Sequence, residues 1–247
     1  MLDKKSLEWY NVSMFKKPNP VLQYESAFPV YPNILEPAVK NIPDWYKGIP
    51  RWEGGEMHDP STNDFNITVK HCMPFLDSLT AGYFIKLPYD VYVDFTVDPP
   101  ITTWTYQGEP ILGQRGKPLS TPIPPAYSVA HLFWRFPLTI KAPKGYSFIV
   151  THPFNRHDLP FLTYTGIVSG GWAMTYFGAL PFLMRDGFKG TIPQGTPIAQ
   201  VIPFKEDMWD AQITPGLKTE SEMNGTRSTS VLYGWYKKTH WSKKTYN

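Results

Sequence analysis

The residues with the clearest chemical potential lie between His152 and Asp158, in the run His-Pro-Phe-Asn-Arg-His-Asp. Histidine and aspartate are residue types that bind transition metals, and His131 could join His152, His157 and Asp158 in a metal-like cluster. However, His157 and Asp158 are adjacent, whereas two ligands on one strand face are separated by one residue. The prolines on either side favour a loop. We therefore expect structural or surface roles for these side chains, and no metal site.

A second candidate pair is His71 with Cys72. One thiol and one imidazole are too few ligands for a metal, and neighbours in a strand point to opposite faces. Cys72 is the only cysteine of the chain, which excludes an intramolecular disulfide and agrees with a reducing compartment. We expect a packed, unreactive thiol. The sequence also has no phosphate-binding glycine loop, nucleophile elbow, His-Glu-x-x-His or nucleic-acid motif, so no catalytic residue, cofactor or nucleic-acid partner is expected.

The framework that must position these residues is predicted to be all-β, in a body that spans residues 61–215. Short β-branched and aromatic runs alternate there with turn residues. Val91–Val97 alternates apolar and polar residues, as a strand with one buried face does. Gln107–Pro125 is predicted to be a long loop, a feature that is often functional. The expected strands are 66–69, 82–87, 91–97, 102–106, 138–141, 146–150, 161–165, 172–177 and 198–204.

Residues 1–60 are predicted to form an extended arm, because prolines interrupt every possible element except short helical turns within Glu36–Lys47. An arm with so little regular structure is not stable alone. Its rings must pack on the body or on another subunit, and tryptophan and tyrosine suit such interfaces. The candidate interface residues of the arm are Trp9, Tyr10, Phe15, Trp45, Tyr46 and Trp52.

Residues 216–247 are predicted to form a C-terminal extension of the same single domain. Lys218–Gly225 reads as a polar loop, and Thr229–Tyr246 reads as a helical segment whose Trp235 and Trp241 join the candidate interface residues. Four lysines gather near its end and suit either a solvated tail or an acidic partner. They are Lys237, Lys238, Lys243 and Lys244.

Composition limits the class of protein. With 42% hydrophobic and 18% charged residues, the 247-residue chain is too apolar to be disordered. The net charge of +3 is small, whereas proteins that bind nucleic acid typically carry a large positive charge. No apolar run approaches the ~18 residues of a membrane span. Two acidic residues within the first eight interrupt any signal peptide, so we expect a cytoplasmic protein.

Four motifs resemble, in order, those of the deoxyuridine triphosphatase and deoxycytidine-triphosphate deaminase superfamily. They are Ala81-Gly-Tyr83, Pro143-Lys-Gly-Tyr146, Gly166-Ile-Val168 and Gln194-Gly-Thr-Pro-Ile-Ala-Gln-Val-Ile202. The resemblance implies a β-clip or jelly-roll-like body and a trimer. In the last motif we expect a glycine where backbones approach and a buried amide that bonds to neighbouring chain.

The residues that perform the superfamily's chemistry are absent. Phe84 stands where the first motif has aspartate, Phe154-Asn155-Arg156 stand where arginine and two serines bind phosphate, and Ser169 replaces the third-motif aspartate. Without these carboxylates a magnesium triphosphate has no anchor and the attacking water has no base. The resemblance therefore implies the fold without the catalysis. Asn155, Arg156 and Gln200 remain candidate ligand-binding residues for an anion.

A broader set of motifs resembles an uncharacterised family of tailed phages, particularly cyanophages, and bacteria. These motifs are His71–Asp77, Ala81–Tyr83, Pro143–Tyr146, His152–Arg156 and Gly195–Phe204. The resemblance implies a phage lineage. We therefore expect a non-enzymatic structural or assembly protein, present in the host cytoplasm during assembly and then in the virion, whose partners are its own copies, as a homotrimer, and other virion proteins. The alternative is a nucleotide-binding or small-anion-binding protein, or a divergent nucleotide hydrolase.

Overall fold

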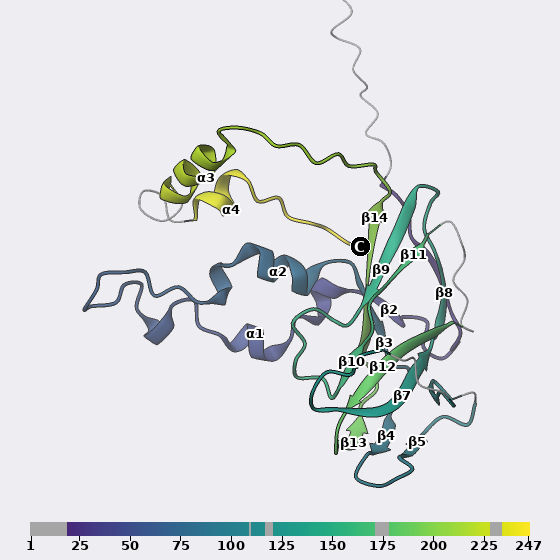
Figure 1. Ribbon diagram of the computed structural model, residues 1–247. Coiled ribbons are helices and arrows are strands. Elements are labelled where there is room, and N and C mark those ends of the chain that lie inside the picture. The colour runs from purple at the N-terminus through teal and green to yellow at the C-terminus, as the bar shows by residue number, and fades with distance from the viewer. Residues whose placement is uncertain (1–18, 109, 117–120, 171–177, 228–233) are drawn as a thin grey trace, which may run out of the picture.

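The computed structural model describes residues 19–108, 110–116, 121–170, 178–227 and 234–247. The protein is mainly β, as expected, and its strands pair antiparallel in four sheets (Figure 1). None of the described helices combines the length and the apolar composition needed to cross a lipid bilayer. The predicted strand 172–177 and the rings of Trp9, Tyr10 and Phe15 lie outside the described residues.

The largest sheet has five strands in the order β11-β9-β14-β3-β2. The last strand in sequence, β14, lies at its centre, with β9 on one side and β3 on the other. This position explains why β14 is apolar, with its first five residues buried. The bounds are β2 (Leu35–Pro37), β3 (Tyr83–Lys86), β9 (Tyr146–Thr151), β11 (Gly166–Ser169) and β14 (Pro197–Lys205).

Three smaller sheets complete the body. A four-stranded sheet has the order β10-β12-β7-β6, a three-stranded sheet the order β13-β4-β5, and β1 pairs with β8. Their bounds are β1 (Gln23–Ser26), β4 (Val91–Asp94), β5 (Ile101–Trp104), β6 (Leu112–Gln114), β7 (Tyr127–Arg135), β8 (Leu138–Lys141), β10 (Phe161–Thr163), β12 (Ala179–Arg185) and β13 (Lys189–Ile192).

One continuous hydrophobic core joins these sheets. Trp134 of β7 stacks on Phe182 of β12 with ring centroids 4.1 Å apart, and Phe161 of β10 meets both rings edge-on. Residues from the predicted N-terminal arm belong to this core, because Phe28, Leu35 and their neighbour Ile34 are buried within it. Residues 23–37 of the predicted arm therefore pair and pack with the body, whereas most of residues 51–60 are exposed.

Short helices lie on one side of the sheets (Figure 1). Prolines cap or start several of them, since Pro37 precedes η3, Pro43 precedes α1 and Pro74 lies in the first turn of α2. The bounds are η3 (Ala38–Asn41), α1 (Asp44–Gly48), η4 (Glu53–Gly55), η5 (Val69–His71), α2 (Met73–Thr80), α3 (Leu217–Thr226) and α4 (Trp235–Thr239).

Most of the predicted strands and helical turns are present in the structure, and two predicted segments are wrong. The strands expected near residues 82–87, 91–97, 102–106, 138–141, 146–150, 161–165 and 198–204 are confirmed, as are the helical turns within Glu36–Lys47. The strand expected at residues 66–69 is wrong, because only isolated bridges at Phe65 and Ile67 form before η5 begins. The polar loop expected at 218–225 is also wrong, because those residues form α3.

Candidate functional site

Gln200 occupies the centre of β14 and is fully buried. Its side-chain oxygen accepts a hydrogen bond from the Phe154 backbone N–H at 2.8 Å. Its side-chain nitrogen donates to the carbonyl oxygens of Ser78 at 3.0 Å and Ala81 at 2.7 Å. The expected buried amide is therefore confirmed. It joins the 152–156 loop, the end of α2 and the start of β3, and its hydrogen-bonding groups are occupied by main chain.

The close backbone approach expected in the last motif occurs instead at Gly82 in the first. Gly82 has a φ of +65°, and a Cβ atom built there would overlap the carbonyl oxygen of Val201. Only glycine fits both conditions. Gly195 has a positive φ of +81° but no close backbone neighbour, so it shapes the turn before β14.

Asn155 is turned toward α2. Its backbone is left-handed, with a φ of +58°, a conformation that asparagine tolerates. Its side-chain nitrogen donates to the Ser78 hydroxyl at 2.8 Å. Gln200 and Asn155 are thus brought together around the end of α2, and the contacts that both make there are structural.

Arg156 points elsewhere and is paired within its own loop. Its Nε lies 2.9 Å from Asp158 Oδ1, and its Nη2 lies 2.8 Å from Asp158 Oδ2. Burial works to raise the pKa of Asp158, but hydrogen bonding and the charge of Arg156 lower it below its ordinary value. The pair is a bidentate, charge-assisted contact that fixes the guanidinium and neutralises it.

Arg156 also lines a surface pocket of about 430 Å³ next to α1. Lys40, Lys47 and Asp44 lie around it. Lys47 pairs with Asp44 at 2.8 Å, so Lys40 is the one lining cation without an ion pair among the described residues. A pocket with one unpaired cation could hold a small anion, but it lacks the convergent donors of a triphosphate site.

His152 is a structural histidine. Its Nδ1 accepts from the Thr163 backbone N–H at 3.4 Å, so its Nε2 carries the hydrogen and donates to the carbonyl oxygen of Arg156 at 3.2 Å. Burial lowers its pKa and favours the neutral ring. No group of three His, Cys, Asp or Glu side chains among the described residues is placed to hold a metal ion.

The exposure and the local structure of Cys72 differ from what the sequence predicts. It is exposed and stands just before α2, outside any strand. The expectation of a packed thiol is therefore wrong, because the chain turns at this residue from η5 into α2 instead of continuing extended.

The three positions that would carry catalysis in the resembled superfamily have different surroundings. Phe84 is buried in the core on β3, and Phe154 is half-buried beside Gln200. Ser169 is exposed on the edge strand β11. The two phenylalanines contribute packing rather than charge.

The predicted interface rings that the structure describes differ in their exposure. Tyr46 is buried and stacks on Phe75 of α2, and the Trp241 indole N–H hydrogen bonds to both carboxylate oxygens of Asp77, at 3.1 and 3.0 Å. Trp52 and Trp235 are half-buried, whereas Trp45 is exposed. Most of these rings therefore already have neighbours within their own chain.

An exposed segment that the sequence interpretation missed follows β14. We call residues 206–226 the acidic limb, because it contains five acidic residues and one lysine. Met208, Trp209 and Ile213 are 103%, 88% and 98% exposed. The signal available in the sequence was three large apolar side chains within six residues of an otherwise polar stretch.

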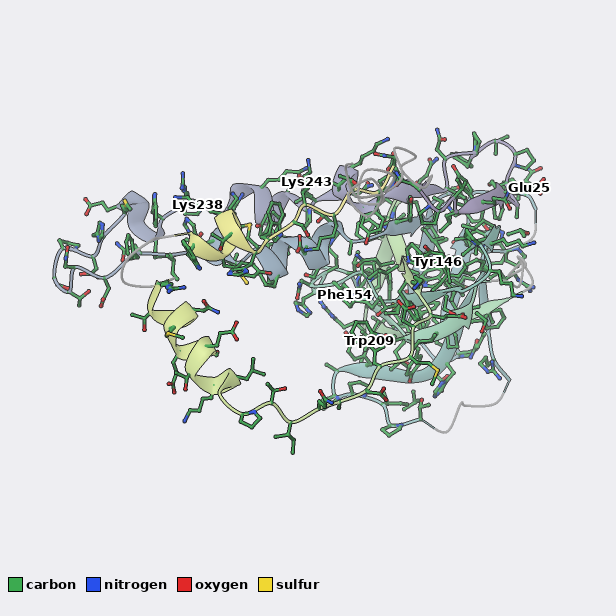
Figure 2. All side chains as sticks on the ribbon, turned by 90° about the horizontal axis from the view of Figure 1, so that it is seen from above. Glu25, Tyr146, Phe154, Trp209, Lys238 and Lys243 are labelled. Atoms are coloured by element: carbon green, nitrogen blue, oxygen red, sulfur yellow. The ribbon has the colours of Figure 1, made fainter. Side chains whose placement is uncertain are left out.

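A second limb returns to the body. We call residues 234–247 the basic limb, because it contains four lysines and no acidic residue. Besides the Trp241–Asp77 contact, Lys244 pairs with Asp77 at 2.7 Å and Tyr246 packs edge-on against Tyr83. Figure 2 shows the two limbs leaving the body along separate paths, with Trp209 on one and Lys238 and Lys243 on the other.

Comparisons with known proteins assign no activity. No protein-family model and no curated protein matches the chain. Among solved structures, the 2'-deoxycytidine 5'-triphosphate deaminase from Agrobacterium tumefaciens is similar at 12% identity with a TM-score of 0.33. The match covers 62% of this chain and 45% of that one, so it spans less than half of the deaminase. The deaminase belongs to the superfamily that the motifs resemble, and at these values the similarity gives this chain no function.

Proposed function

We propose that the protein is a non-enzymatic assembly protein that acts through contacts with other chains, as a virion component in the phage lineage that its motifs resemble. The observation that supports this proposal is the acidic limb, where Met208, Trp209 and Ile213 are almost completely exposed. Large apolar side chains left in solvent together mark interaction sites. A tryptophan among them is the residue type most enriched in interface hot spots.

The contacts within the candidate ligand site support the same proposal, because its polar side chains already bond to groups of the protein itself. Gln200 and Asn155 use their amides on backbone and on Ser78, and Arg156 is neutralised by Asp158. A ligand would have to replace these contacts, each of which is made inside the fold. The described site therefore suits a scaffold better than a nucleotide pocket.

Mass measurement tests the proposal. We expect the purified protein to assemble in light-scattering chromatography, with the trimer implied by the superfamily resemblance as the reference mass. A variant with Met208→Ser, Trp209→Ser and Ile213→Ser should lose assembly while its circular dichroism stays unchanged, because these side chains are almost completely exposed in the described chain. The matched control is Val129→Ser with Ile167→Ser, which removes exposed apolar side chains from the body. A wild-type monomer that is also absent from purified phage particles would overturn the proposal.

A nucleotide screen tests the alternative. Ligands that bind only the folded state raise its melting temperature. We expect no saturable shift with nucleoside triphosphates, with or without Mg²⁺. A saturable shift that Arg156→Ala and Lys40→Ala both remove would favour an anion-binding function in the pocket beside α1.

A further inference from the structure

Most of the acidic limb is exposed in the part of the chain that the structure describes. Every described residue from Lys205 to Arg227 is exposed except Asn224, and α3 has no buried residue. Its ten-residue helix begins at Leu217, after Gly216 at the N-cap, and has no side-chain cap. Isolated helices of fewer than about 12 residues are marginal in water, so a surface that packs against α3 would stabilise it.

The sequence of the acidic limb also has the pattern of a strand that lacks a partner. Trp209, Ala211 and Ile213 alternate with Asp210, Gln212 and Thr214, which gives one apolar and one polar face if the segment is extended. No strand is formed there in the described chain. The limb therefore carries both an apolar face and a surplus of negative charge.

The basic limb has complementary properties. Among the described residues, Lys237, Lys238 and Lys243 have no ion pair. Tyr236 is 42% exposed and Trp235 is half-buried, so rings accompany the positive charges. Contacts with Asp77 and Tyr83 hold this limb against α2 and β3. It is thus an anchored surface of lysines and rings.

We propose that the acidic limb of one copy packs along the basic limb of a second copy. The proposal rests on the assembly function inferred above and names its partner as the same chain. The stretches that join each limb to the body follow separate paths in Figure 2, and no ion pair joins the two limbs among the described residues. Each copy offers one limb of each sign, so a reciprocal pair and a closed ring both satisfy every limb. Opposite charges set the register of the contact, while Trp209 and Ile213 supply its apolar area.

Charge reversal tests this pairing. The first variant reverses the acidic limb with Asp210→Lys, Glu220→Lys and Glu222→Lys, and the second reverses the basic limb with Lys237→Glu, Lys238→Glu and Lys243→Glu. Each should raise the protein concentration needed for half-assembly about tenfold or more, because like charges then face each other. The variant with both reversals should assemble as the wild type does, since the limbs are again complementary.

The control reverses three exposed acidic residues outside the limbs, Glu25→Lys, Glu56→Lys and Asp186→Lys, and should assemble normally. Circular dichroism and melting curves verify that all four variants fold. A wild-type monomer, single-limb variants that assemble like the wild type, or a folded double variant that stays monomeric would each overturn the inference. If the serine variant loses assembly while both single-limb reversals keep it, the assembly function stands and the limb-on-limb contact is wrong.

Discussion

The side chain of Gln200 and the backbone N–H of Phe154 form a 2.8 Å hydrogen bond that ties the centre of the largest sheet to the 152–156 loop. The same amide donates to Ser78 and Ala81. One buried side chain therefore satisfies three main-chain groups that no strand partner reaches.

Replacing Gln200 with alanine should destabilise the protein by about 3 kcal/mol or more, because buried backbone groups left without a partner cost ~1–3 kcal/mol each. Urea unfolding measures the change. Gln194→Ala is the matched control, since this exposed glutamine lies in the turn before β14 and, among the described residues, its backbone N–H bonds to Asp90 while its side chain has no hydrogen bond. Equal effects of the two substitutions would contradict the structural role of Gln200.

Gly82→Ala should be costly for two reasons, the left-handed backbone and the overlap of the new methyl with the Val201 carbonyl. We expect a loss of about 3 kcal/mol or more from strain and overpacking together. Gly145→Ala separates the two effects, because Gly145 has a φ of +82° and open space around it. Its loss should be about 1 kcal/mol. If Gly145→Ala proved as damaging as Gly82→Ala, the overlap would not be the cause.

Trp134→Ala should destabilise the core by roughly 3–5 kcal/mol, because a buried ring that stacks on Phe182 and meets Phe161 edge-on is lost. Trp134→Phe should cost less than Trp134→Ala, because phenylalanine retains most of the buried ring. The buried indole nitrogen has no hydrogen-bond partner among the described residues, so phenylalanine removes no bond. Thermal unfolding compares them with Trp209→Ala, an exposed tryptophan whose removal should change monomer stability by about 0.5 kcal/mol at most.

Asp94 should make stability depend on acid pH. Hydrogen bonds from Lys189, at 2.8 Å, and from Thr96 lower the pKa of Asp94 from 3.8 to about 2. Because the folded pKa lies below the unfolded value, the contribution is complete above pH 4 and is lost as the pH falls toward 2.

The measurement is the free energy of unfolding of the wild type and of Asp94→Asn between pH 6 and pH 2. The difference between the two proteins should be largest above pH 4 and should shrink steadily below it. A difference that stayed constant across this range would show that the Asp94 charge does not contribute. Lys205→Met serves as a control, because its ion pair with Asp207 is exposed and should leave the curve unchanged.

Local sequence patterns predicted the strands in which apolar and polar residues alternate or apolar residues form a short run. The alternation that begins at Val91 gave β4, and the apolar run at Ile198 gave the centre of β14. The buried amide at Gln200 followed from a motif in which a polar residue stands inside a strand. These features depend on residues close together in the chain.

Long-range pairing explains what the sequence did not reveal. Gln23–Ser26 forms a strand because Leu138–Lys141 lies beside it, more than a hundred residues later. The prolines around Phe28 and Leu35 indicated an extended arm, so the burial of these two side chains was not predicted. Their burial depends on core residues far along the chain. α2 was missed because Pro74 reads as a breaker, although proline is favoured in a first turn. α3 was predicted to be a loop because Lys218–Gly225 is polar, and the structure agrees that none of its side chains is buried.

The position of β14 also constrains how the protein is made. β3 is complete at Lys86, but the strand that pairs with it ends only at Lys205. At about 5–20 residues per second, a ribosome adds the intervening residues in roughly 10 seconds. During that interval the nascent β3 and β9 lack their common partner and expose strand edges that invite aggregation. Cellular yield should therefore respond to translation speed and to chaperones that hold unpaired strands until the last one emerges.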